Sequence, residues 1–361
     1  GEKVSESVRT LSSLPVRCAG IAITNPVTTS QPNYEASTLV CSHLIQAIQG
    51  KSEFYPMVHG GCLLSRFFSA CIRKDAADEQ RRLLLETLSN PRDRRAIERG
   101  CKTGSYLSAV PSTINGSTLG EIEFQDSIRT RAALPLLNLP SHCDGCGENF
   151  TIAHAHSCKN GGNIIARHDE IVAELVSLST MAFKPNAVRA EPQIHTGSST
   201  ATADTDSTVE TSDRGDVLVR GLWRTGQDAI LDIRVTDTDQ ASYVSRDPER
   251  VLQSHEKEKK RKYLRPCQQQ RRAFTPFVVS VDGLIGMEAK NVMKALSRRL
   301  ALKWQKPYSQ VMSIVKTRIS IACVRASHRC LRGSRVPVKK MSRQIQWDDG
   351  AGLGLYRIDT D

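Results

Sequence analysis

The sequence lacks any apolar run long enough to cross a membrane. Such a span needs about 20 consecutive apolar residues, and no stretch of the 361-residue chain approaches that length. The first residues, GEKVSESVRT, also lack the apolar segment of a secretory signal peptide, so we expect this end to come from within a longer protein. We therefore predict neither a membrane protein nor a membrane partner.

A disulfide framework is also absent from the pattern of cysteines. The 11 cysteines are an odd number and are scattered along the chain, which favours a reducing compartment. The first 140 residues contain neither a glycine-rich phosphate loop nor a motif of paired carboxylates. Apolar residues at helical spacing over 34–50 and 75–90 instead predict helices that pack on one another.

Acidic residues are missing from a long C-terminal stretch. Fifty Lys and Arg against 38 Asp and Glu give the chain a formal net charge of +12. Fifteen of these basic residues lie between Lys290 and Arg343, where no acidic residue occurs, and a second basic run, HEKEKKRKYLRP, lies at 255–266. Because no carboxylate relieves the repulsion within such a stretch, we expect a polyanion as partner, and nucleic acid is the usual one.

The chain does contain a closely spaced group of thiols and imidazoles after its helical first part. In the run HCDGCGENFTIAHAHSCKNGG, Cys143 and Cys146 are separated by two residues, and His154 and Cys158 follow. Two cysteines at this spacing turn around one ion, and a nearby histidine and cysteine complete a tetrahedral shell, which predicts a structural zinc knuckle. His156 is the alternative nitrogen ligand, although His154 has the better spacing to Cys158.

The part after the knuckle alternates helical and strand patterns. We expect the order helix, strand, strand, strand, helix, strand, followed by two basic amphipathic helices. The expected elements are a helix at 162–183, strands at 187–194, 215–223 and 228–236, a helix at 247–265, a strand at 274–283, and helices at 287–304 and 308–330. A segment rich in Ser, Thr and Asp, 196–213, is expected to be an exposed loop.

Two aspartates in this part indicate a metal-dependent hydrolase. Asp216 begins one expected strand, and Asp232 lies within the next on the same face as Arg234. A charged side chain within an apolar strand is costly unless it is paired or binds a metal. Folding the hairpin about Thr225–Gly226 brings the two acids together, close enough to share one ion. The alternative interpretation makes Asp216 a turn residue and pairs Asp232 with Arg234.

With acids on its second and third strands, this order resembles the restriction-endonuclease-like PD-(D/E)XK arrangement. Asp216, after Gly215, takes the place of PD, and Asp232 begins the (D/E)XK stretch. Arg234 stands where the family has lysine, and arginine stays protonated and cannot serve as a general base. The expected substitutes on the next helix are Lys259 and Lys262, with Tyr263 on the same face. Further carboxylate candidates are Glu191 and, less favoured, Glu170 and Glu174.

Basic side chains around this core are the expected contacts to nucleic acid. The trio Arg167-His168-Asp169 begins the helix after the knuckle and either contacts phosphate or supports the metal site. A half-buried His168 on the apolar face of that helix is the alternative. The predicted nucleic-acid contacts are Arg167, His168, Lys260, Arg261, Arg298 and Arg299.

These features resemble the C-terminal part of the polyprotein of LINE-like (non-LTR) retrotransposons with a restriction-like endonuclease. In that family the reverse transcriptase thumb is followed by a linker, a CCHC knuckle and a PD-(D/E)XK-like nuclease. The matching stretches are Leu14-Pro15-x4-Gly20-Ile21-x-Ile23, Cys143 to Gly162, Arg167-His168-Asp169, Glu191-Pro192, Gly215-Asp216, Asp232-Ile233-Arg234-Val235 and Lys259-x2-Lys262-Tyr263. The departures are Cys18-Ala19-Gly20, where the family tends to carry paired glycines, and His156, where an apolar residue is usual.

The resemblance implies an α/β fold in four parts. A thumb-and-linker-like helical region (1–140) and the knuckle (141–162) precede a PD-(D/E)XK-like mixed sheet flanked by helices (163–345), and a tail (346–361) follows.

The implied function is an endonuclease that acts in the nucleus with Mg²⁺ or Mn²⁺ on Asp216 and Asp232. It nicks target DNA to prime reverse transcription of the element's RNA. No YxDD-type aspartate pair occurs in the sequence, so the polymerase palm is expected upstream or lost. The alternative is a non-catalytic, nucleic-acid-binding module from a decayed element.

Overall fold

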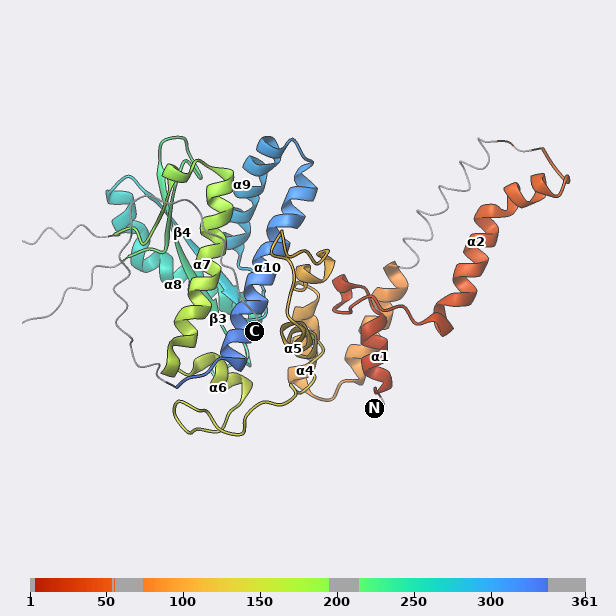
Figure 1. Ribbon diagram of the computed structural model, residues 1–361, viewed down its shortest axis with the longest axis horizontal. Coiled ribbons are helices and arrows are strands. Elements are labelled where there is room, and N and C mark those ends of the chain that lie inside the picture. Colours follow the sequence, from red (N-terminus) through yellow and green to blue (C-terminus); the bar gives the residue numbers. More distant parts are fainter. Residues whose placement is uncertain (1–3, 54, 56–73, 195–213, 337–361) are drawn as a thin grey trace, which may run out of the picture.

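The computed structural model describes residues 4–53, 55, 74–194 and 214–336, and these form a mixed α/β protein around one four-stranded sheet (Figure 1). The strands are β1 (Val188–Ala190), β2 (Val217–Arg220), β3 (Asp228–Thr236) and β4 (Ala273–Ser280), in the order β1-β2-β3-β4. The first three are antiparallel neighbours, whereas β4 runs parallel to β3. A parallel pair needs a crossover connection, and α8 (Pro248–Gln269) provides it.

Helices cover both faces of this sheet. On one face lie α7 (Asn163–Ala182), α9 (Met287–Trp304) and α10 (Tyr308–Arg332), and on the other lies α8. Side chains along β3 alternate between these two faces. Leu231 and Ile233 enter the core with α7, α9 and α10, whereas Ile230 packs against Tyr263 of α8. Within the described ranges, no helix is both long enough and apolar enough to cross a membrane.

The N-terminal region is helical where it is described. Its elements are α1 (Glu6–Ser13), η1 (Val16–Cys18), α2 (Pro26–Ile48), a helix over 74–87, α4 (Pro91–Gly100), η2 (Ser105–Ser108) and α5 (Glu121–Arg131). A small core that includes Leu11, Leu14, Leu84 and Ile97 joins α1, the helix over 74–87 and α4. Figure 1 shows α5 beside α10, which links this region to the sheet-bearing part.

Between the two parts lie α6 (Ile152–Ser157) and η3 (Asn160–Gly162), with η4 (Pro185–Ala187) before β1.

The predicted order of elements after the knuckle is confirmed, and the bounds of α7, β3 and α9 agree closely with the predicted ranges. β1 is shorter than the predicted 187–194 because Glu191, with φ of 47°, leaves the extended conformation. α8 continues past 265 through Pro266, since Cys267 is buried in the core beyond it. The predicted loop at 196–213 and tail at 346–361 lie outside the described residues.

Candidate functional site

Two aspartates meet where β2 pairs with β3. The antiparallel register places Val217 opposite Leu231, and the backbone N–H of Asp216 donates to the Leu231 carbonyl over 3.0 Å. Asp216 therefore stands opposite Asp232, one residue before β2 begins. Its carboxylate also accepts a hydrogen bond from the backbone N–H of Ile233. The hairpin thus places the two acids singled out from the sequence at neighbouring positions of the sheet.

Lys259 reaches these acids from α8. Its Nζ lies 2.7 Å from Asp232 Oδ2, and the two side chains are 23% and 7% exposed. Burial raises the pKa of Asp232, Lys259 counteracts this effect, and the charge of Asp216 adds to it. A buried carboxylate of this kind is stabilised in its ionised form by a cation at contact distance. Lys259 provides such a cation.

His168 approaches the same acids from α7. Its Nε2 lies 3.3 Å from Asp216 Oδ2, and its Nδ1 lies 3.2 Å from Asp169 Oδ1. The hydrogen bond to Asp216 raises the pKa of His168, although burial opposes the shift. The neighbouring Arg167 is buried, and its guanidinium donates to the His156 carbonyl over 3.0 Å. This burial does not fit the phosphate contact predicted for Arg167.

Arg234 has a partner other than the acids that precede it in sequence. It pairs with Glu258 of α8 over 2.9 Å, whereas the partner of Asp232 is Lys259. The alternative interpretation, in which Asp232 only pairs with Arg234, is therefore wrong. The two less favoured glutamates of α7 are engaged by α10: the Glu170 carboxylate lies 3.7 Å from Arg329, and that of Glu174 lies 2.5 Å from Arg318.

Three other predicted catalytic residues have contacts to residues other than Asp216 and Asp232. They are Lys262, Tyr263 and Glu191. The ammonium of Lys262 donates to the Tyr263 hydroxyl over 2.7 Å, and the Tyr263 ring is buried in the core beneath α8. The Glu191 carboxylate is exposed and lies 3.3 Å from the Arg214 guanidinium. One lining residue of a surface depression, Lys259, contacts Asp232. The depression is lined by Arg234, Glu258, Lys259, Arg261, Lys262 and Tyr263.

The other predicted nucleic-acid contacts fall on two separate surfaces. Arg261 is exposed on α8 and lines a surface depression together with Lys259, and Lys260 on the same helix pairs with Glu288. Arg298 and Arg299 lie on α9, which covers the opposite face of the sheet. Arg299 donates to a backbone carbonyl at the end of β2. Arg261 therefore lies on the same helix as Lys259, the partner of Asp232, whereas Arg298 and Arg299 do not.

A second cluster can hold a metal ion. Cys143, Cys146, His154 and Cys158 each offer one ligand atom, and these atoms all lie within 4.8 Å of one another. Burial disfavours the Cys143 thiolate, but hydrogen bonds from the Gly145 backbone and from neighbouring groups outweigh it and lower the pKa of Cys143 to about 6. A thiol that ionises readily is suited to bind a metal, because the thiolate is the ligand.

The two candidate histidines of the knuckle have different surroundings. His154 belongs to the ligand group, whereas His156 points into the protein and is 5% exposed. Both lie on α6, where a separation of two residues turns side chains about 200° apart. Burial lowers the pKa of His156 to about 3, and its ring lines a cavity together with Asp126 and Arg131. His154 is therefore the nitrogen ligand that the fold offers.

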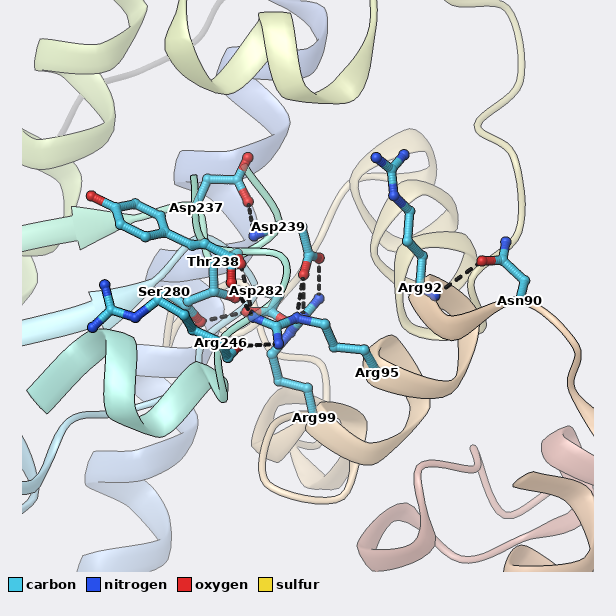
Figure 2. Close-up of polar contacts among 11 residues, drawn as sticks. Asn90, Arg92, Arg95, Arg99, Asp237, Thr238, Asp239, Arg246, Ser280 and Asp282 are labelled. Atoms are coloured by element: carbon cyan, nitrogen blue, oxygen red, sulfur yellow. Dashed lines mark hydrogen bonds and ion pairs between the residues drawn. The ribbon is translucent and has the colours of Figure 1, made fainter. Parts of the chain in front are cut away.

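A buried charge cluster joins α4 to the ends of β3 and β4, and sequence reasoning missed it (Figure 2). The Arg99 guanidinium donates to both oxygens of Asp239 over 2.7 and 2.6 Å and also contacts Asp282. Arg95 donates to Asp239 over 3.0 Å and to the Thr238 carbonyl over 2.9 Å. Figure 2 shows both arginines extending from α4 toward these acids. The partners of Arg99 lie 140 and 183 residues away in sequence, so no local pattern reveals them.

The comparison with models of protein families finds no match for this chain, and the search of curated proteins finds none. Two places in the molecule bring together side chains with the chemistry of a functional site. One is the centre formed by His168, Asp216, Asp232 and Lys259. The other is the Cys/His group of the knuckle.

Proposed function

We propose that this chain is the metal-dependent endonuclease module of a LINE-like non-LTR retrotransposon protein, with a restriction-endonuclease-like PD-(D/E)XK core. One observation carries the proposal: Asp216, just before β2, stands opposite Asp232 of β3, and Lys259 of α8 contacts Asp232. Two carboxylates and a lysine around one point form the set that metal-assisted hydrolysis of a phosphodiester requires.

Asp216 and Asp232 would hold Mg²⁺ or Mn²⁺. Both present carboxylate oxygens, which are the ligands that these hard cations prefer. The charge of Asp216 contributes to the raised pKa of Asp232, so a cation bound by both would relieve their repulsion. When bound, the ion would polarise the phosphate and lower the pKa of the attacking water.

Lys259 and His168 support the two acids from opposite faces of the sheet. The Lys259 side chain, 2.7 Å from Asp232, is placed to orient the attacking water as an ammonium or to accept its proton as a neutral amine. Arg234 does not take this role, because it stays protonated and is paired with Glu258. His168 Nε2, 3.3 Å from Asp216, holds the orientation of that carboxylate.

The DNA backbone would lie along α8 beside these acids. Four of the six side chains that line the depression there are cationic: Arg234, Lys259, Arg261 and Lys262. Cations bind phosphates without regard to sequence and position the duplex for chemistry. A nick in target DNA within the nucleus would expose the 3′ end that primes reverse transcription of the element's RNA.

In the knuckle we assign the ion as zinc. A tetrahedral zinc with bonds to sulfur of about 2.3 Å separates two thiolates by about 3.8 Å. The sulfur of Cys158 lies 3.9 Å from that of Cys143 and 3.9 Å from that of Cys146. The cluster therefore has the size and the ligand set of a structural zinc site.

Nicking of supercoiled plasmid tests the proposed activity. We expect nicked circles with Mg²⁺ or Mn²⁺ and none with EDTA. The double variant Asp216→Asn with Asp232→Asn should lose nicking while it still binds DNA. The matched control is Asp228→Asn, since Asp228 lies at the start of β3 and is 30% exposed. Unchanged nicking by the double variant would contradict the assigned site.

The second candidate is a nucleic-acid-binding module that does not cut. It is favoured by the contacts that both acids already make within the chain, Asp232 with Lys259 and Asp216 with His168. The arginine in the family's lysine position also favours it. DNA binding that survives EDTA, without product under any metal condition, would support this candidate over the nuclease.

A further inference from the structure

The segment that follows α10 passes through the knuckle. Arg335 is 1% exposed, less than any other charged residue among those the structure describes. Its guanidinium donates to the carbonyls of Gly333 and Ala155 over 3.0 and 3.1 Å, and also to that of Cys330. The same group lies over the Phe150 ring, 4.9 Å from the ring centre. Arg335 thus joins the end of α10 to the loop and helix that carry the metal ligands.

The backbone around Arg335 is enclosed just as closely. The Asp144 carboxylate, one residue after the first cysteine ligand, accepts hydrogen bonds from the Arg335 N–H over 3.1 and 3.0 Å. A Cβ on Gly145 would lie 2.6 Å from Arg335 Cβ, and one on Gly161 would lie 2.3 Å from Arg335 Cα. Only residues without a side chain fit at these two positions. The metal loop therefore closes around Arg335 from two sides.

The first turns of α7 contact the same segment and the knuckle from another side. Asn163 donates from its side chain to the carbonyls of Gly333 and Ser334 over 3.2 and 3.3 Å. One turn later, Arg167 donates to the His156 carbonyl of the knuckle over 3.0 Å. The next residue is His168, whose Nε2 contacts Asp216. The knuckle, the end of α10 and the start of α7 are therefore packed together, and α7 reaches Asp216 through His168.

The surface of the knuckle does not suit a polyanion. Between 141 and 162 the sequence has one Lys or Arg, Lys159, against Asp144 and Glu148. Both acids are exposed. Zinc bound by three thiolates and one imidazole adds a net charge of about −1. Phosphates would be repelled from this surface rather than attracted to it.

We propose that the knuckle is a metal-dependent positioning element of the nuclease centre and not a nucleic-acid contact. The metal keeps the loop closed on Arg335, and Arg335 and Arg167 are positioning residues that hold the start of α7 so that His168 meets Asp216. The effect on cleavage rests on the proposed endonuclease function. The closure, by which we mean the metal-dependent packing of the knuckle loop around Arg335, does not depend on that function.

Transfer of zinc from the full chain to a coloured chelator tests the closure. Arg335→Met removes the guanidinium but keeps the apolar length of the side chain. We expect zinc to leave this variant about 10-fold to 100-fold faster than the wild type, because removal of groups that support metal ligands weakens metal affinity by about this factor. The matched control is Arg329→Met, because Arg329 lies near the end of α10, six residues before Arg335, and is 51% exposed. Zinc release from Arg335→Met at the control rate would overturn the proposal.

A milder variant keeps the test decisive if Arg335→Met does not fold. Asp144→Asn retains the shape of the side chain and removes the charge that accepts the Arg335 N–H. We expect faster zinc release here too, by a smaller factor than for Arg335→Met. Zinc release from a folded Asp144→Asn protein at the wild-type rate would overturn the closure.

Hydrogen exchange and cleavage kinetics test the link to the nuclease centre. After zinc removal, or in Arg335→Met, we expect faster amide exchange over 160–170 with α9 unchanged. The single-turnover nicking rate should fall about 10-fold, and the dissociation constant for the duplex should stay the same. Weaker duplex binding with unchanged exchange would show that the knuckle reads nucleic acid and would overturn the proposal. If the wild type never nicks DNA, the nuclease proposal fails, while zinc release and exchange still decide the closure.

Discussion

Replacing Arg99 with methionine removes the guanidinium that connects α4 to the ends of β3 and β4. The Arg99 side chain is 5% exposed, and its partner Asp282 is 18% exposed. Breaking a buried ion pair by removing one member costs about 3–5 kcal/mol, because the remaining charge is left uncompensated. The second partner, Asp239, is 43% exposed and adds little. We therefore expect Arg99→Met to lower the free energy of unfolding by about 3–5 kcal/mol at pH 7.

This loss should depend on pH. Burial raises the pKa of Asp282, but the charge of Arg99 and further hydrogen bonds outweigh it, so the pKa of Asp282 is lowered overall. A carboxyl with a lowered pKa contributes stability above its ordinary pKa of about 4, and this contribution disappears as the pH falls through the lowered value. The difference between the wild type and Arg99→Met should therefore shrink in acid.

Urea unfolding followed by circular dichroism, at pH 7 and well below pH 4, measures both effects. The matched control is Arg94→Met, since Arg94 lies on α4, is exposed and donates to a backbone carbonyl. The control should change stability by no more than about 0.5 kcal/mol. If Arg99→Met unfolds at the same urea concentration as Arg94→Met at pH 7, the reasoning from buried charge is refuted.

Three further predictions concern other buried or crowded positions. Asp237 has a pKa raised by burial, so Asp237→Asn should be more stable than the wild type at pH 7 and equal to it below about pH 4, as measured by urea unfolding. Gly161→Ala should cost about 1–3 kcal/mol more than Gly162→Ala in thermal unfolding; both glycines have φ of 72°, but only the new Cβ at 161 meets Arg335. Equal losses would exclude the close contact. Lys259→Met should slow single-turnover nicking about 100-fold, and Lys259→Arg should not restore it, because arginine does not release its proton. Full rescue by arginine would show that Lys259 contributes only its positive charge to cleavage.

The hairpin of β2 and β3 could be predicted from the sequence because its information is local. Alternation in β3 separates Asp232 from Leu231 and Ile233, and the turn before Gln227 sets the pairing that brings Asp216 opposite Asp232. For the lysine that replaces the family's catalytic lysine, the sequence could indicate only a part of α8 and not the residue. Which lysine contacts Asp232 depends on how that helix lies across the sheet, and this is set by buried residues such as Tyr263.

The main error in the predicted site concerned two residues that are adjacent on one helix. Arg167 and His168 are adjacent in sequence, yet consecutive residues of a helix point about 100° apart. Only one of them can face the acids, and Arg167 turns inward to the knuckle instead. The clusters around Arg99 and Arg335 depend on chain segments more than 100 residues apart, so they became visible only in the fold.

Single-turnover cleavage of an end-labelled DNA duplex with Mn²⁺ tests the central claim most directly. The wild type is compared with Asp232→Asn, which keeps the shape of the side chain beside Lys259, and with the control Asp228→Asn. We predict metal-dependent cleavage by the wild type and the control, and a loss of about 100-fold or more in Asp232→Asn with duplex binding unchanged. Cleavage by Asp232→Asn at the wild-type rate, or a folded, zinc-loaded wild type that binds the duplex and never cuts it, would contradict the account.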